Sequence, residues 1–178
     1  ADHFPCSGAV AMELAAFPPF LWLLKVREWI WDILERETGA RMTHSFARIG
    51  GMAAPPTATF KQDCLEILPE VHKVVNEAES LLLRNRIFMD RTQDVGILPK
   101  DVALGLSVTG PVLRSTGVDY DARKAYPYLV YDRLEFEVPI GHKGDNYDRF
   151  LVRFEEVRQS CRIIEQALEQ MPTDGPVN

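Results

Sequence analysis

The chain has 178 residues, of which 46% are hydrophobic and 26% are charged, and its formal net charge at pH 7 is −6. This length suits one domain with a substantial core, and the composition is that of a globular protein. The acidic balance argues against a nucleic-acid-binding protein, and no apolar run reaches the roughly 20 residues of a membrane-spanning helix.

The first half of the chain predicts three helical regions. Residues 8–16 are expected to form a short helix that the sequence FPPF ends. A second helix is predicted over Leu21–Thr38, with Gly39 as its C-terminal stop. The following stretch, MTHSFARIGGMAAPP, is predicted to be a loop by its glycines and prolines. A third helical region spans about Thr57–Arg84, where Pro69 predicts a kink or two abutting helices.

The second half combines short helices, a long irregular segment and one clear helix. After the third region the sequence predicts a short helix, a turn, and a second short helix that begins at Pro99. Residues 109–144 show little regular pattern, and only RLEFEVP alternates as a strand would. This segment is too rich in aromatic and aliphatic residues for a free linker, so we expect it to be ordered. The last helix starts at Asp145 or Asn146, which are good N-cap residues, and carries a long apolar stripe.

These elements predict one domain over residues 1–178 that is mainly α. Long helices pack as part of a bundle beside the long ordered irregular segment, with at most a short β-hairpin. The irregular segment alternates cations and anions among its aromatic residues, a pattern that favours docking against a partner or lining a cavity. A tightly packed structural loop is the alternative. The candidate docking residues are Arg114, Asp119, Arg123, Lys124 and Tyr126.

The cysteines give no sign of a metal site. Cys6, Cys64 and Cys161 lie far apart, and no C-x-x-C pair occurs. Zinc and iron–sulfur sites within one chain usually need such pairs, so we expect this chain to bind no metal. Each cysteine falls on an apolar face of a predicted helix, and free cysteine is among the residues most often buried. All three are therefore predicted to be buried.

Several long motifs resemble one family. They are TGPVLR-S-G, RKAYPY and GD-YDR-LVR-EE-R-S, with ELAAFPPFLWLLKVRE and ETGARMTHSFARIGG earlier in the chain. Together they resemble the D subunit of respiratory complex I, the NADH–quinone oxidoreductase, which descends from the large subunit of nickel–iron hydrogenases. The likeness is nearly collinear from about residue 2 to the end. Family members are roughly twice as long, so the chain resembles the central fragment of a longer D-subunit-like chain.

The resemblance implies a part in the quinone-reducing module of a proton-pumping NADH–quinone oxidoreductase. In the family, the D subunit packs against the neighbour that holds the terminal iron–sulfur cluster, and the two form the cavity for the quinone head. The C subunit and a membrane-arm subunit are further implied partners, on the cytoplasmic side of the bacterial inner membrane. The iron–sulfur clusters and FMN belong to other subunits, so this chain alone is expected to hold no cofactor and to be inactive.

The resemblance also implies roles for particular residues. Glu13, in MELAAFPPF, stands where the family has an Asp that pairs with the quinone-site His; such a carboxylate would orient the imidazole and raise its pKa. Beside the terminal cluster, the family has a His directly after its Arg-Met pair. Here Thr43 stands at that position and His44 follows it. Either His44 takes over, or Thr43 gives a neutral hydrogen bond and couples protonation weakly to cluster reduction, which we favour. Arg48 matches the family.

Two other interpretations remain open at this point. One is a large-subunit-like component of a related membrane-bound hydrogenase or ferredoxin-dependent complex. The other is a non-catalytic scaffold whose loops only dock partners. In the isolated chain, apolar residues of the irregular segment should lie partly exposed, so we expect either self-association or a mobile segment. These residues are Leu113, Val118, Tyr126, Tyr128 and Leu129.

Overall fold

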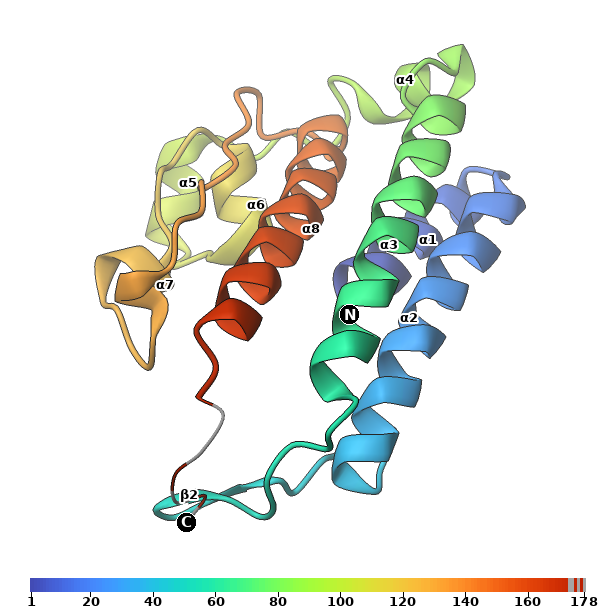
Figure 1. The fold of residues 1–178 in the computed structure, drawn as a ribbon. Helices are drawn as coiled ribbons and strands as arrows, with labels where there is room; N and C mark the ends of the chain where they lie inside the picture. The colour runs from blue at the N-terminus through green and yellow to red at the C-terminus, as the bar shows by residue number, and fades with distance from the viewer. Residues whose placement is uncertain (173–174, 176, 178) are drawn as a thin grey trace.

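The computed structural model describes residues 1–172, 175 and 177. Four longer helices lie side by side, and several short helices cover the outer side of the last one (Figure 1). The long elements are α1 (His3–Glu13), α2 (Phe17–Thr38), α3 (Phe60–Leu82) and α8 (Asn146–Glu169). Within the described residues the only strands are the two-residue pair β1 (Ala47–Arg48) and β2 (Gly51–Met52), so the prediction of a mainly α fold is confirmed.

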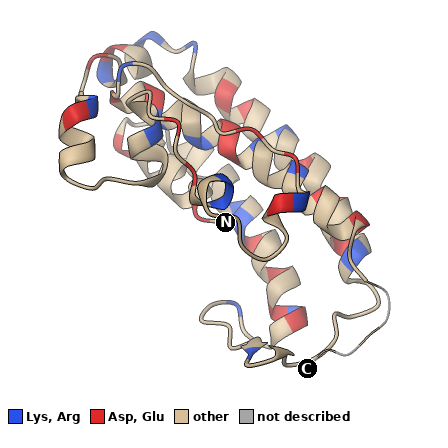
Figure 2. Cartoon of the chain, turned by 90° about the vertical axis from the view of Figure 1, so that its left-hand side faces the viewer, with Lys and Arg blue, Asp and Glu red and all other residues tan. Residues whose placement is uncertain are grey.

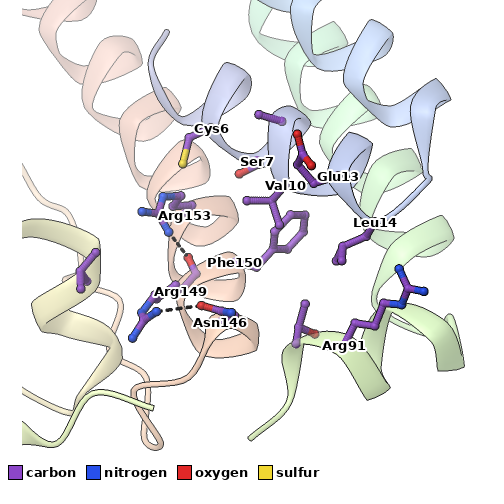
Figure 3. A pocket seen from close by; sticks show the side chains of 13 residues that line it. Cys6, Ser7, Val10, Glu13, Leu14, Arg91, Asn146, Arg149, Phe150 and Arg153 are labelled. Carbon is purple, nitrogen blue, oxygen red and sulfur yellow. Dashed lines mark hydrogen bonds between the residues drawn. The ribbon is translucent and has the colours of Figure 1, made fainter. Parts of the chain in front are cut away.

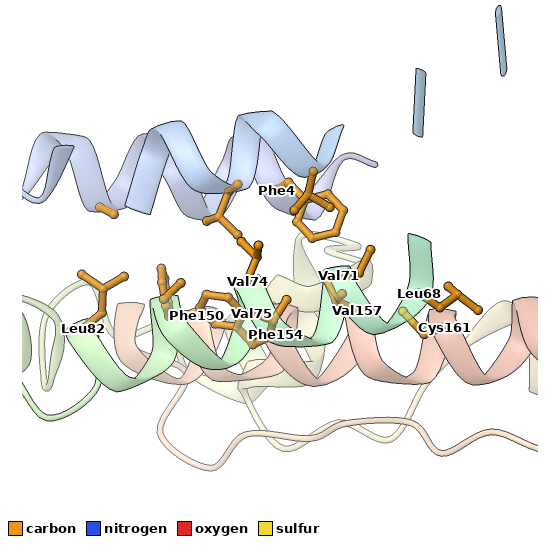
Figure 4. Close-up of a cluster of buried hydrophobic side chains, with 14 of the residues drawn as sticks. Phe4, Leu68, Val71, Val74, Val75, Leu82, Phe150, Phe154, Val157 and Cys161 are labelled. Carbon is orange, nitrogen blue, oxygen red and sulfur yellow. The ribbon is translucent and has the colours of Figure 1, made fainter. Parts of the chain in front are cut away.

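One apolar cluster holds the four long helices together (Figure 4). The aromatic rings of Phe88, Phe150 and Phe154 stack edge to face in its centre, with ring centroids 4.9 Å and 4.6 Å apart. Such stacking adds to the free energy gained by burying the rings. The other buried members of the cluster are Phe4, Ala11, Leu23, Val26, Leu68, Val71, Val74, Val75, Ala78, Leu82, Val157 and Cys161.

The long helices follow their predicted signals, with three differences. Helix α1, predicted over residues 8–16, begins at His3 and ends at Glu13. Gly39 ends α2 in the left-handed conformation, with φ 78°, as predicted. Helix α2 starts earlier than predicted, because a proline in the first turn needs no hydrogen-bond donor and FPPF begins the helix rather than breaking it. Helix α3 continues through Pro69 without dividing into two helices. The Asp145 side chain caps α8 by accepting a hydrogen bond from the backbone N of Asp148 at 2.8 Å, which confirms the predicted start.

The region between α3 and α8 contains only short helices. They are α4 (Arg86–Thr92), α5 (Lys100–Gly105), α6 (Gly110–Ser115), α7 (Ala122–Ala125) and the 3₁₀ helix η1 (Tyr131–Arg133). The predicted strand RLEFEVP is wrong, because residues 134–138 have no strand partner. Side chains of α8 replace that partner: the backbone N of Glu135 donates to Gln166 at 2.8 Å, and that of Glu137 donates to Gln159 at 2.9 Å. Leu134 and Phe136 pack with Ile163 of α8 in a second small apolar cluster.

A buried ion pair fixes the start of the irregular segment to α8. Arg114 is only 7% exposed, and its Nε and one terminal nitrogen both donate to the Oε1 atom of Glu156, the former at 2.7 Å. His3 of α1 completes the group, with its Nε2 3.1 Å from Oε2 of Glu156. Burial raises the pKa of Glu156 against the opposing effect of Arg114. Burial also lowers the pKa of His3 to about 4, so at neutral pH this ring is an uncharged donor.

Candidate functional site

A cavity of about 480 Å³ lies between α1, α4 and α8, and we call it the α1–α8 cavity (Figure 3). Glu13, the last residue of α1, lines it with an exposed side chain. Val10, Leu14 and Phe150 supply apolar wall, and Arg91, Arg149 and Arg153 are the cationic residues of the lining. Its size falls within the range of small-molecule and peptide pockets. Glu13 therefore borders a space that another group can enter.

Glu13 has no ionic partner in the part of the chain that the structure describes. No Lys, Arg or His nitrogen lies within the 4.0 Å ion-pair distance of its carboxylate. The sequence predicts an interaction with a His that this chain does not contain, and the geometry leaves Glu13 available for one. An exposed carboxylate without a partner is also what a simple solvated helix end would present. Its position on the cavity is what distinguishes Glu13 from other exposed acids.

The loop between α2 and α3, residues 40–59, carries the other predicted site residues, and we call it the polar loop. Thr43 and His44 are exposed, and Thr43 has a positive φ of 54°, which is uncommon for a residue other than glycine. The Thr43 hydroxyl donates to the Met42 carbonyl at 2.7 Å. Arg48 lies in β1, and its guanidinium donates to the backbone carbonyl and the hydroxyl of Ser45, at 2.5 Å and 2.9 Å. The side chains that were predicted to face a partner's cluster thus all lie on one exposed loop.

Acidic side chains of α2 hold both ends of this loop. Its first anchor is Arg41, whose guanidinium donates to three carboxylates at 2.6–2.7 Å. These belong to Glu28, Asp32 and Glu35. At the far end, Glu37 accepts hydrogen bonds from the backbone N of Thr57 at 2.9 Å and from its hydroxyl at 2.5 Å. The loop is therefore held to α2 at its ends, while its middle stays largely exposed and is bound through the backbone N of Met52, which donates to the carbonyl of Val177 at 2.8 Å.

The structure does not bring Glu13 and the polar loop together. Glu13 ends α1 just before the start of α2, and the loop follows the other end of α2, which is one of the longest helices in Figure 1. A helix of 22 residues is about 33 Å long, which separates the two groups along the bundle. No single small-molecule site within this chain can include both.

The candidate docking residues divide by burial. Arg114 is buried and bound to Glu156, which speaks against direct contact with a partner. Arg123 is half-buried: it donates to Asp121 at 2.6 Å, and its guanidinium lies over the ring of Phe136, 4.8 Å from the centroid. Asp119, Lys124 and Tyr126 are exposed. Charges of both signs are spread over the elements that Figure 2 shows, so a docking surface here would be mixed in sign.

The prediction that apolar residues of the irregular segment are partly exposed is correct for some of them and wrong for Leu113. Leu113 is 3% exposed, contrary to the prediction, because α6 packs on α8. Tyr126, Tyr128 and Leu129 are exposed, with Leu129 at 87%. These three form the exposed tip between α7 and η1.

The prediction for the cysteines holds only in part. Cys161 is buried, and burial raises its pKa to about 11. Cys64 is half-buried, and the prediction is wrong for Cys6, which is exposed on α1 beside the α1–α8 cavity. Within residues 1–172, 175 and 177, no group of three His, Cys, Asp or Glu side chains could hold a metal ion.

The sequence did not point to His3, Asp121 or Glu156, although all three belong to the ion network at the base of the irregular segment. Glu156 and Arg114 are 42 positions apart, and no local pattern relates them. One weak signal is present: Glu156 directly precedes Val157 in the apolar stripe of α8, so it lies near the border of the buried face.

The fold and the site together define a mainly helical protein with an open cavity at one end of its bundle and an anchored polar loop at the other. Among the described residues, no helix is long and apolar enough to span a membrane. A family model described as the 49 kDa subunit of respiratory-chain NADH dehydrogenase matches residues 13–178, and the chain belongs to this family.

Similar proteins agree with this assignment. A D subunit of NADH-quinone oxidoreductase from Sorangium cellulosum is 61% identical over 99% of this chain and 44% of its own length. The D subunits of the same enzyme from Pelobacter propionicus and Myxococcus xanthus are 47% and 46% identical, over 100% and 99% of this chain. They are covered over 44% and 42% of their own lengths. The chain therefore spans less than half the length of these relatives.

Proposed function

We propose that this chain is a quinone-site segment of a proton-pumping NADH–quinone oxidoreductase. Family membership supports the assignment, and the relatives bear that enzyme's name. The observation that carries the site is the position of Glu13 on the α1–α8 cavity without an ionic partner among the described residues. In this proposal the quinone is the substrate, and the clusters and FMN lie in other subunits.

Glu13 would act as a positioning residue. Its carboxylate would accept a hydrogen bond from a His supplied by another part of the D subunit, fixing the tautomer of the ring and raising its pKa. That His would then contact the quinone head. The apolar walls around Glu13 would strengthen the interaction, because a charge is poorly screened where water is displaced.

The Glu13→Gln variant in the intact complex tests this role. Quinone reductase turnover should fall, while NADH oxidation by an artificial acceptor stays unchanged because that chemistry occurs at the flavin. Glu13→Asp should retain more turnover than Glu13→Gln, since it keeps the charge. Glu77→Gln is the matched control, because Glu77 is an exposed acid on α3 outside the cavity lining. Unchanged turnover in Glu13→Gln would refute the role and favour the scaffold alternative.

We also propose that the polar loop faces the terminal iron–sulfur cluster of a neighbouring subunit. Thr43 stands at the position of the usual His, and its hydroxyl can give only a neutral hydrogen bond, so cluster reduction should couple weakly to protonation. A His whose pKa responds to the cluster would give about 59 mV per pH unit between its two pKa values. Redox titrations of the cluster at several pH values measure the slope. A full slope that disappears in His44→Ala would show that His44 has taken over.

The proposed partners can be related to the geometry. A cluster-bearing neighbour that contacts both Glu13 and the polar loop would have to lie along α2, because the two lie beyond opposite ends of that helix. The exposed part of the irregular segment, with Asp119, Lys124 and Tyr126, would dock another subunit, such as the C subunit or a membrane-arm subunit. The complex would place the chain peripherally at the cytoplasmic side of the bacterial inner membrane.

A further inference from the structure

The α1–α8 cavity is cationic, although the chain as a whole is acidic. Three arginines and one glutamate are the charged residues of its lining, in a protein with a net charge of −6. Arg149 and Arg153 come from successive turns of α8, and Arg91 comes from the last turn of α4. Figure 3 shows Arg149 and Arg153 together on one side of Val10 and Phe150, with Arg91 on the other side. The cavity therefore combines apolar walls with an excess of positive charge.

The three arginines of the cavity differ from other arginines of the same helices. Farther along α8, Arg158 binds Glu79 and Glu155, and Arg162 lies 3.4 Å from Glu135. Within the described residues, no carboxylate lies at ion-pair distance from Arg91, Arg149 or Arg153. Unpaired cations thus gather at the cavity, while those elsewhere on α8 are neutralised.

The environment of Arg149 adds a second observation. One of its terminal nitrogens donates to the carbonyls of Gly96 and Gly144, at 2.6 Å and 2.8 Å, and the other donates to the side-chain oxygen of Asn146 at 2.8 Å, so its position is fixed. Its Nε atom is buried and has no acceptor. Burial and the nearby charge of Arg153 lower the pKa of Arg149. Two like charges one helical turn apart disfavour the helix unless an anion approaches them.

Arg153 is the more available of the two cations. It donates one hydrogen bond, from a terminal nitrogen to the backbone carbonyl of Arg149 at 3.0 Å. A guanidinium has five N–H donors, so most of those on Arg153 remain free to bind a planar anion such as a carboxylate.

We propose that the α1–α8 cavity binds an acidic polypeptide segment, in which an Asp or Glu carboxylate meets Arg149 and Arg153 while flanking apolar side chains fill the space against Val10, Leu14 and Phe150. A small inorganic anion would satisfy the charges and leave the apolar walls exposed. A purely apolar segment would do the reverse. A polypeptide occupant fits the family, since the relatives extend well beyond the part that this chain covers. The site stands whether or not Glu13 serves a quinone-site His.

Nuclear magnetic resonance titration of the 178-residue chain tests the proposal with three probes. These are N-acetyl-Leu-Asp-Leu amide, its Asn counterpart and inorganic sulfate. The Asp peptide should shift signals of α1, α4 and α8 around the cavity and bind about tenfold more tightly than the Asn peptide, as expected for a hydrogen bond to a charged group. Equal binding of the two peptides would overturn the proposal. So would sulfate binding that is as tight as that of the Asp peptide, since it would indicate a general anion site.

Substitutions of single arginines test which of them cause the preference for the Asp peptide over the Asn peptide. Arg153→Gln should abolish most of the preference for Asp, and Arg153→Lys should restore part of it. Arg158→Gln is the matched control, because Arg158 lies on α8 but already binds Glu79, and it should leave the preference unchanged. Arg149→Gln could perturb folding through the lost contacts to Gly96 and Gly144, so the salt dependence of the wild-type preference provides a second measurement. The preference should shrink as salt screens the charges, and a preference that survives both Arg153→Gln and high salt would contradict the site.

Discussion

Two long connections in this molecule lack regular structure, and they are held in opposite ways. The polar loop, residues 40–59, is fixed at its ends by the exposed acidic side chains of α2, and its middle is exposed. The irregular segment, residues 109–144, is fixed from within: Arg114 pairs with buried Glu156, and Phe136 packs with Ile163 in a small core. Its longest exposed run, from Lys124 to Val130, resembles the loop in its exposure.

The difference shows that buried side chains, rather than regular hydrogen-bond ladders, decide which connection is an integral part of the fold. Glutamine side chains of α8 bind the backbone of residues 135 and 137 and take the place of a neighbouring strand. Surface ion pairs contribute little to stability, whereas breaking a buried pair leaves an uncompensated charge. The irregular segment should therefore unfold with the bundle, and the polar loop should move independently of it.

The largest effect is expected from the buried ion pair. Arg114→Gln leaves the Glu156 carboxylate buried with only His3 beside it, and should lower the free energy of unfolding by about 3–5 kcal/mol. Urea denaturation followed by circular dichroism measures this. The double variant Arg114→Met/Glu156→Gln should recover part of the loss, because neither remaining side chain is charged. A loss below about 1 kcal/mol would mean that water or local movement solvates Glu156 in the variant.

A smaller effect should follow removal of the aromatic anchor. Phe136 is 4% exposed, packs with Leu134 and Ile163, and lies beneath Arg123 and Lys124. Phe136→Ala should cost about 3 kcal/mol of the free energy of unfolding and speed hydrogen exchange across residues 122–138. Tyr126→Ala in the exposed tip is the control, with an expected change within about 0.5 kcal/mol. Similar losses in both variants would contradict the division between anchor and tip.

The pH dependence of stability should report the burial of His3. Its folded pKa of about 4 lies below the ordinary value of 6.5, so lowering the pH from 7 to 5 protonates the unfolded chain but not the folded one. Stability should therefore fall, by about 1 kcal/mol after allowance for the part of the ring that solvent reaches. The raised pKa of Glu156 acts with the opposite sign as the pH falls. Comparison with His3→Gln isolates the effect, and an equal loss in both proteins would contradict it.

Local signals in the sequence predicted much of the bundle. The apolar stripe of α8, the cap at Asp145 and the stop at Gly39 each act within a few residues, so the C-terminal end of α2 and the start of α8 were predicted correctly. The prediction of a strand in RLEFEVP was wrong because an alternating pattern cannot reveal that the hydrogen-bond partners of this backbone are glutamines of a distant helix. The prediction that Cys6 is buried was wrong for a related reason. Which side of α1 is covered depends on how α1 packs against α2 and α8.

The candidate site was predictable only where a motif marks it. Glu13, Thr43, His44 and Arg48 were identified through the resemblance to a family, since neither composition nor periodicity separates them from other surface residues. The cationic character of the α1–α8 cavity could not be predicted, because it depends on the arrangement of three helices and on which arginines remain without carboxylates. Such long-range pairings are set by tertiary packing.

Arg41→Gln is expected to change stability least. It is also the sharpest test of the difference between the polar loop and the irregular segment. Arg41 holds the polar loop through Glu28, Asp32 and Glu35, and their carboxylates raise the pKa of its guanidinium above the usual value. These groups are accessible to solvent, so the unfolding midpoint should hardly change.

Hydrogen exchange in residues 42–56 should nevertheless become faster in Arg41→Gln, because the loop loses one of the two anchors that bind its ends to α2, and the rates in residues 109–121 should stay as they are. Arg36→Gln removes a different exposed pair, Arg36 with Asp63 at 2.9 Å, which joins α2 to α3, and it leaves in place the hydrogen bond that the Thr59 hydroxyl of the loop donates to Asp63 at 3.0 Å. It should leave exchange in the loop unchanged. If both variants loosened the loop equally, its order would come from the packing of α2 on α3. If Arg41→Gln slowed or spared exchange there, the loop would be held by contacts along its middle, and its distinction from the irregular segment would fail.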